Sequence, residues 1–117
     1  MEYLKIKTEN IYISHVALTQ IIGVAIAETP GVCGIIAKDI TGNIKRFIKK
    51  ENFWYGIKIR ERNEKIDIAC HLILAYGTPI PTITNLIIEN VKNILIKDCN
   101  IEINKVFIYV DKILLDQ

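Results

Sequence analysis

The stretch that decides the fold runs from Ile66 to Ile113 and reads IDIACHLILAYG (66–77), TPIP (78–81), TITNLIIENVKNILIKDC (82–99) and IEINKVFIYVDKI (101–113). Side chains of different character alternate in its first and last segments, which is typical of β-strands. The third segment has apolar residues at helical spacing, and Pro81 suits the first turn of a helix. The stretch therefore predicts a strand, a long amphipathic helix over 81–98 and a second strand over 101–113.

This alternation divides the side chains of the two strands between two faces of a sheet. We expect one face to pack against the helices, and it carries Ile66, Ile68, Cys70, Leu72, Leu74, Val106, Ile108 and Val110. The other face carries Asp67, Ala69, His71, Ile73, Ala75, Phe107 and Tyr109. The alternation breaks between Ile103 and Val106, so a bulge is expected near Asn104 and Lys105.

The residues before Ile66 add further layers to this unit. We expect a strand in the second half of 3–13, then a helix over 15–28, capped by Ser14 and ended by Pro30 and Gly31. A short strand over 32–37 and a hairpin of 56–60 with 65–76 follow. The predicted fold is one α+β domain over 1–117, with two main helices on one face of a mixed or antiparallel sheet. This two-layer sandwich has the order β-α-β-(short α)-β-β-α-β.

The segment from 38 to 55 is the least regular part of the sequence. Apolar residues at helical spacing predict a short amphipathic helix and are Ile40, Ile44, Phe47 and Ile48. The helix would carry a basic surface of Lys45, Arg46, Lys49 and Lys50. Such a surface suits an anionic membrane or a nucleic acid. Alternatively, the lysines are solvated and the segment only connects two strands.

Small residues on the helix over 15–28 suggest a second surface. Gly23 and Ala27 lie one turn apart, which would allow the backbone of another subunit to approach closely. The alternative is that the chain covers these residues itself.

Composition excludes several classes of protein. The formal net charge is +2 and the sequence pI is about 8.4, too mild to indicate nucleic-acid binding by charge alone. Three scattered cysteines form no C-x-x-C pair, so we expect buried free thiols in a reducing cytoplasm. The longest apolar block, 21–27, is shorter than the roughly 20 residues that span a bilayer, and charged residues interrupt the first residues, so no secretory signal is expected.

No catalytic, cofactor or metal site is expected. His15 and His71 have no second histidine or cysteine at metal-ligand spacing. Asp67 and His71 share a strand face, but we interpret them as solvated residues. Ser14 is interpreted as a helix cap and Gly77 as turn chemistry.

The ordered pattern resembles the alkaline shock protein family of Gram-positive bacteria, also called the general-stress or envelope stress response family. No single motif carries this resemblance, which rests on an ordered set of residues: Ile11, Ile13, Ser14, Pro30, Gly31, Val32, Gly34, Gly56, Lys58, Asp67, Tyr76, Gly77, Ile80, Pro81, Glu89, Asn90, Val91, Lys92, Val106, Ile108 and Val110. Asn100 stands where the family usually has glycine. Ala75 and Tyr109 stand where its members tend to carry polar residues, so the outer sheet face here is more apolar.

The resemblance implies a non-enzymatic cytoplasmic protein, held in some members at the inner face of the membrane by a membrane-spanning partner. It implies a homo-oligomer or a partner-binding scaffold, with a membrane anchor or a lipid-synthesis enzyme as partner. We expect the interaction surface to include Ile73, Ala75, Phe107 and Tyr109, because an exposed apolar patch usually marks an interaction site. An RNA-binding α+β module is the alternative, and nucleic acid is the less favoured partner.

Overall fold

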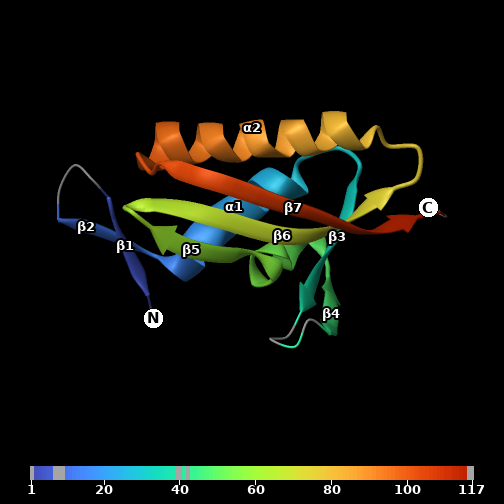
Figure 1. The fold of residues 1–117 in the computed structure, drawn as a ribbon, viewed down its shortest axis with the longest axis horizontal. Coiled ribbons are helices and arrows are strands. Elements are labelled where there is room, and N and C mark those ends of the chain that lie inside the picture. The colour runs from blue at the N-terminus through green and yellow to red at the C-terminus, as the bar shows by residue number, and fades with distance from the viewer. Residues whose placement is uncertain (1, 7–9, 39–40, 42, 116–117) are drawn as a thin grey trace.

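The computed structural model describes residues 2–6, 10–38, 41 and 43–115, except for the side chains of 44–46. A sheet forms one layer and two helices form the other (Figure 1). The helices are α1 (His15–Ala27) and α2 (Ile80–Cys99). The five strands of the main sheet are β3 (Val32–Lys38), β4 (Ile44–Ile48), β5 (Lys58–Arg62), β6 (Lys65–Ala75) and β7 (Ile103–Leu114). The expected α+β sandwich is confirmed.

Strand β6 is the centre of the sheet. One of its edges pairs with β7 in parallel along nearly its whole length. The other edge pairs antiparallel with β5 over residues 65–69 and with β3 over residues 71–74. Strand β4 extends the sheet beyond β3. The sheet is therefore mixed, and β6 has neighbours on both edges.

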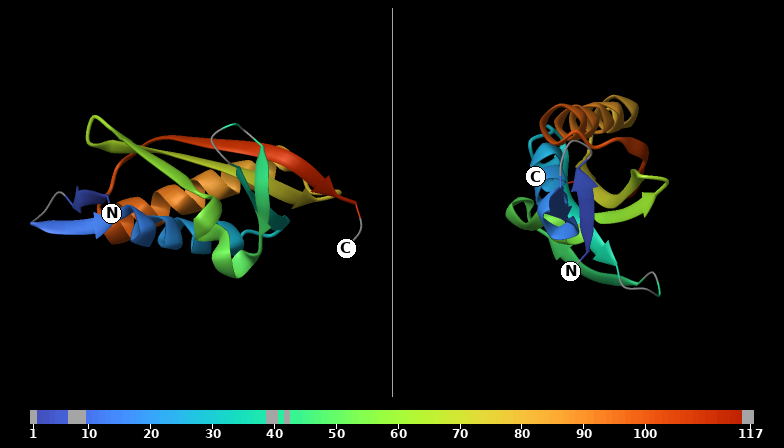
Figure 2. Two further views of the ribbon diagram at one scale, coloured as in Figure 1. Left: turned by 90° about the horizontal axis from the view of Figure 1, so that it is seen from below. Right: turned by 90° about the vertical axis from the view of Figure 1, so that its left-hand side faces the viewer.

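Both helices lie on the same side of the sheet, as the view from below shows (Figure 2, left). The expected inner face is confirmed: Ile66, Ile68, Leu72 and Leu74 are 0 % exposed and Cys70 is 1 % exposed. Burial raises the pKa of the Cys70 thiol to about 12, so this cysteine stays protonated near neutral pH. Cys33 and Cys99 are free thiols that are only half-buried.

Local signals place the element ends close to where the sequence predicts them. The Ser14 side chain accepts a hydrogen bond from the Ala17 N–H at 3.0 Å and caps α1. Asn100 ends α2 in the left-handed conformation with φ of 53°, which asparagine tolerates better than most residues. Two positive-φ residues, Asn63 and Glu64, turn the hairpin of β5 and β6.

The prediction of a short amphipathic helix between residues 38 and 55 is wrong. Residues Ile44–Ile48 form β4 and pair with β3, and a 3-10 helix, η1 (Lys50–Gly56), follows. Short apolar runs fit both helical and strand periods, and here the open edge of β3 supplies the strand's hydrogen bonds. Ile40, which we assigned to this helix, lies outside the described residues.

An N-terminal hairpin stands apart from the main sheet. It consists of β1 (Tyr3–Ile6) and β2 (Ile11–Ser14), which pair only with each other among the described strands. It projects beyond one end of the sandwich (Figure 1). Leu4 is buried in the core and anchors it, whereas Tyr3 and Tyr12 are exposed.

Candidate functional site

The candidate site is the outer face of the sheet, opposite the helices. It comprises the side chains of β6 that point away from the core, together with their neighbours on the other strands. The two long helices, α1 and α2, lie on the other side of the sheet (Figure 2, left). Strand register defines its rows: Asp67 lies between Arg60 and Lys105, Ala69 between Lys58 and Phe107, and His71 between Ile36 and Tyr109.

The four residues expected to form an interaction surface differ in exposure. Phe107 is 41 % exposed and Tyr109 is 48 % exposed. Ile73 is half-buried, and Ala75 is 9 % exposed at the end of β6. The two aromatic side chains are therefore the accessible part of the expected surface.

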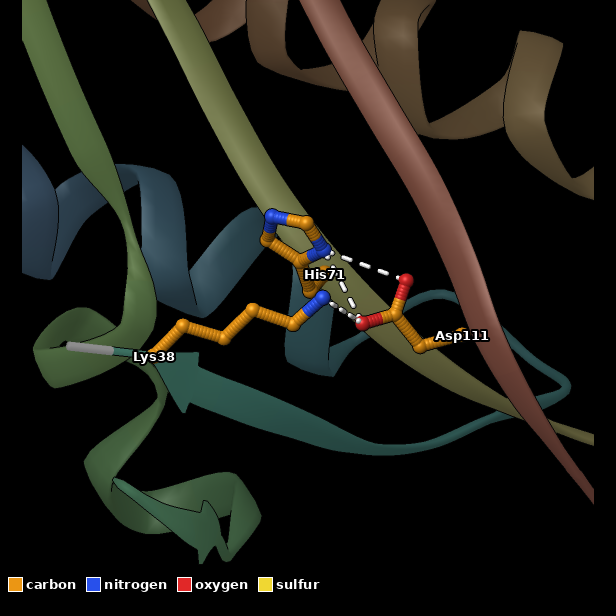
Figure 3. Close-up of polar contacts among 3 residues, drawn as sticks. All are labelled: Lys38, His71 and Asp111. Carbon is orange, nitrogen blue, oxygen red and sulfur yellow. Dashed lines mark hydrogen bonds and ion pairs between the residues drawn. The ribbon is translucent and has the colours of Figure 1, made fainter. Parts of the chain in front are cut away.

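A polar cluster of three strands crosses the middle of the outer face (Figure 3). The Nδ1 atom of His71 lies 3.1 Å and 3.0 Å from the two carboxylate oxygens of Asp111. The Nζ atom of Lys38 lies 2.7 Å from Oδ2 of the same carboxylate. We expected His71 to be solvated near Asp67, but its partner is Asp111, whereas Asp67 pairs with Arg62 at 3.6 Å.

A β-bulge directs Asp111 into this cluster. Leu72 pairs with Val110 and the next residue of β6, Ile73, pairs with Lys112. Asp111 is therefore the extra residue of β7, and a bulge of this kind re-aims a side chain. A second bulge at Asn104, between the pairs of Ile66 with Ile103 and Asp67 with Lys105, confirms the break expected near 104–105.

The cluster stabilises the charged form of Asp111. Burial of its carboxyl raises the pKa, but hydrogen bonds from Lys38 and His71 and their positive charges outweigh that effect, so the pKa is lowered. The side chains of Lys38, His71 and Asp111 are 25 %, 26 % and 20 % exposed. Asp111 is thus a negatively charged group that joins β3, β6 and β7.

In the row of His71 and toward the carboxyl end of β6, the face carries large apolar side chains. We call this part the apolar half: Phe47, Ile73, Tyr109 and Leu114. The Tyr109 ring stacks on His71 with a centroid distance of 4.6 Å and an angle of 14°. The Lys112 Nζ lies 5.3 Å from the centroid of the Phe47 ring, within cation–π range. Phe47 reaches this face because β4 is a strand.

Toward the amino end of β6 the face is basic and contains a cleft of about 380 Å³. We call this part the basic half: Lys58, Arg60, Asp67, Ala69, Lys105 and Phe107. Five of these residues line the cleft, and Lys105 lies opposite Asp67 in the strand register. Lys58, Arg60, Lys105 and Phe107 are exposed, whereas Asp67 and Ala69 are half-buried. The outer face therefore divides into two chemically different halves.

The other expected interaction residues lie elsewhere. A Cβ on Gly23 would approach Trp54 N to 3.0 Å, so η1 of the same chain covers this glycine, as in the alternative interpretation. Gly23 and Ala27 line a cleft of about 410 Å³ between α1 and η1. Of the expected basic surface, Lys49 and Lys50 are exposed, and Lys45 and Arg46 lie in β4 with side chains outside the described part.

Sequence reasoning did not assign Lys38, Phe47 or Asp111 to this face. They come from three strands, and β4 was expected to be helical. The only sequence signal was the reversal of polarity from Val110 to Asp111 in an apolar strand. Among the described residues, no three His, Cys, Asp or Glu side chains could together hold a metal ion.

Fold and face together define a small α+β domain with an open, chemically mixed sheet surface. Residues 3–115 match the alkaline shock protein 23 family, which is described by a cell envelope-related function, and the chain belongs to this family. In the described residues no helix has the length and apolar character needed to cross a membrane.

Curated relatives come from Gram-positive bacteria. The chain is 29 % identical to the uncharacterized protein YloU of Bacillus subtilis over 108 residues, covering 92 % of this chain and 90 % of the relative. It is 28 % identical to the uncharacterized protein YqhY of the same organism over 96 residues, covering 82 % and 70 %. It is 26 % identical to the uncharacterized protein Spy1614 of Streptococcus pyogenes over 113 residues, covering 94 % and 93 %. No solved structure matches the chain.

Proposed function

We propose that this chain is a non-enzymatic, cytoplasmic binding module of an envelope-related process, and that a protein partner docks on the apolar half of the outer face. The observation that carries this proposal is the exposure of its large side chains. Phe47 is 56 % exposed, Tyr109 48 % and Leu114 37 %. Exposed apolar groups of this size on one face of a protein often mark an interaction site.

Rigidity of the surface supports the same function. Tyr109 is held by its stack on His71, and His71 is held by Asp111. Aromatic side chains that are already ordered lose little conformational entropy on binding. The partner is another copy of the chain, a membrane anchor that places the domain at the inner face of the membrane, or a lipid-synthesis enzyme that it regulates.

The experiment compares a double variant of the apolar half with a matched control. Phe47→Ser with Tyr109→Ser removes two exposed rings from the face, and Val24→Ser with Ile96→Ser removes two exposed side chains from the helices. Affinity purification from native lysate should recover a defined partner with the wild type and the helix control, and lose it with the face variant.

Light scattering tests the self-association option separately. A wild-type protein that stays a monomer at high concentration would exclude a second copy as the partner. Equal recovery of the partner by all three proteins would contradict docking on the apolar half.

A further inference from the structure

We infer that the basic half of the outer face binds single-stranded nucleic acid, with one base in the cleft beside Phe107 and phosphates on Lys58, Arg60 and Lys105. This site is separate from the protein docking proposed above, because it uses the other half of the face. Either proposal can fail without the other.

The shape of the cleft fits a flat ring. Ala69 forms the floor, with Phe107 beside it on β7 and Lys58 beside it on β5. Strands two apart in a sheet are separated by about 10 Å, and the alanine side chain fills little of that space. A base that stands on Ala69 would contact the Phe107 ring, and base–aromatic stacking is the main affinity term in single-strand binding.

Two cations line the cleft on one side, and a third lies on the strand at its other side, opposite Asp67. Arg60 and Lys58 come from β5 and Lys105 comes from β7. None of the three forms an ion pair in the described part of the chain, unlike Arg62, which pairs with Asp67. Cations on two sides of one base match the phosphates on either side of it in a strand. A free mononucleotide has a phosphate on one side only.

One carboxylate oxygen of Asp67, a residue that lines the cleft, accepts no hydrogen bond from any residue that the structure describes. Its Oδ1 atom is buried and has no hydrogen-bond partner among the described residues, whereas Oδ2 lies near Arg62. An unsatisfied buried acceptor is unfavourable and needs an explanation. The amino and imino N–H groups of an unpaired nucleobase are donors of the required kind. Because Oδ1 has almost no accessible surface, the Asp67 side chain would have to turn toward the cleft to accept from them.

An acidic polypeptide fits this cleft less well. Its carboxylates would pair with the three cations just as phosphates would, so charge does not distinguish the two ligands. Such a segment would neither need the Phe107 ring nor donate to Oδ1. A nucleic-acid duplex is disfavoured as well, since its bases are paired and stacked and cannot enter the cleft.

Fluorescence anisotropy with a labelled single-stranded RNA of about twelve nucleotides, within the range of known site sizes, tests the inference. The variant Lys58→Glu with Arg60→Glu should weaken binding at least about tenfold. Lys92→Glu with Lys97→Glu makes the same charge change on exposed positions of α2 and should leave binding almost unchanged. The slope of log K against log salt concentration should become less steep by about 1.4 in the first variant only, because two phosphate contacts are lost.

Three further variants separate this site from non-specific attraction. Phe107→Ala should weaken binding about tenfold, and Phe107→Trp should retain it. Asp67→Ala removes a negative charge, so non-specific attraction predicts tighter binding, whereas the base contact predicts weaker binding. Far-ultraviolet circular dichroism checks that each variant is folded.

Several results would overturn the inference. They are no binding at low salt, equal losses in the face and helix charge variants, tighter binding by Asp67→Ala, and equal affinity for a duplex, a mononucleotide or a glutamate-rich peptide. A single-stranded DNA of the same sequence shows whether the sugar matters. Binding of either single strand in the pattern above supports the site.

Discussion

The two faces of β6 are built from alternate residues of one strand, yet they have opposite roles. Ile66, Ile68, Leu72 and Leu74 are completely buried under the helices, while Asp67, Ala69, His71 and Ile73 on the other face remain half-exposed. The inner face must be apolar because it forms the core. The outer face carries no such requirement, so its chemistry changes from basic to polar to apolar along one strand.

The largest expected difference between the faces is in core packing. Leu72→Ala should lower the free energy of unfolding by about 2–5 kcal/mol, because it removes buried methyl groups and leaves a cavity. Ile73→Ala, the next residue on the outer face, should cost clearly less. Urea unfolding of both variants measures this, and equal losses would mean that the outer face is also packed.

A smaller effect is expected where η1 closes the inner face. A Cβ on Gly56 would lie 2.1 Å from the Ile35 Cγ2 atom, closer than real Cβ contacts, so Ile35 must move. Gly56→Ala should lower the free energy of unfolding by about 1–3 kcal/mol through overpacking. Thermal unfolding measures the loss, and a wild-type midpoint would contradict the tight contact.

The polar cluster of the outer face should contribute about 0.5–1 kcal/mol, since its side chains are only partly buried. The folded-state pKa of Asp111 lies below the ordinary value of 3.8. Its stabilisation is therefore present above pH 3.8 and is lost as the pH falls through the lowered folded-state pKa.

Comparing the wild type with Asp111→Asn tests the direction of this pH dependence. The variant should be less stable near neutral pH, and the difference should shrink in unfolding measurements at progressively lower pH. A difference that does not depend on pH would show that the carboxylate charge is not responsible.

The smallest effect is expected for the exposed rings. Phe107→Ser should change the free energy of unfolding by less than about 0.5 kcal/mol, as surface substitutions usually do, while it removes the aromatic wall of the cleft. Chemical denaturation checks this against Leu72→Ala. A large loss would mean that the Phe107 ring supports the fold and is not available for binding.

Much of the fold could be predicted from local signals. The Ser14 cap, the left-handed Asn100 and the break near Asn104 depend on a few neighbouring residues, and the structure contains all three. Strand β4 could not be predicted, since its apolar spacing also fits a helix and the choice depends on pairing with β3. For that reason Phe47 was not predicted to lie on the outer face.

The candidate site was predicted in part. Phe107 and Tyr109 follow from alternation alone, because side chains two apart share a face. The cluster of Lys38, His71 and Asp111 could not be predicted from alternation. It joins three strands and depends on a bulge that places one extra residue in β7. Gly23 was assigned to a subunit contact as one of two interpretations, and η1 occupies that position.

The sequence by itself determined the buried face of β6, where the main helices begin and end, and that Phe107 and Tyr109 point away from the core. These properties depend on periodicity and on local hydrogen bonds. Only the tertiary structure decided which side chains from separate strands meet on the outer face. Strand order and bulges set those contacts, and they arise from pairing between segments far apart in the chain.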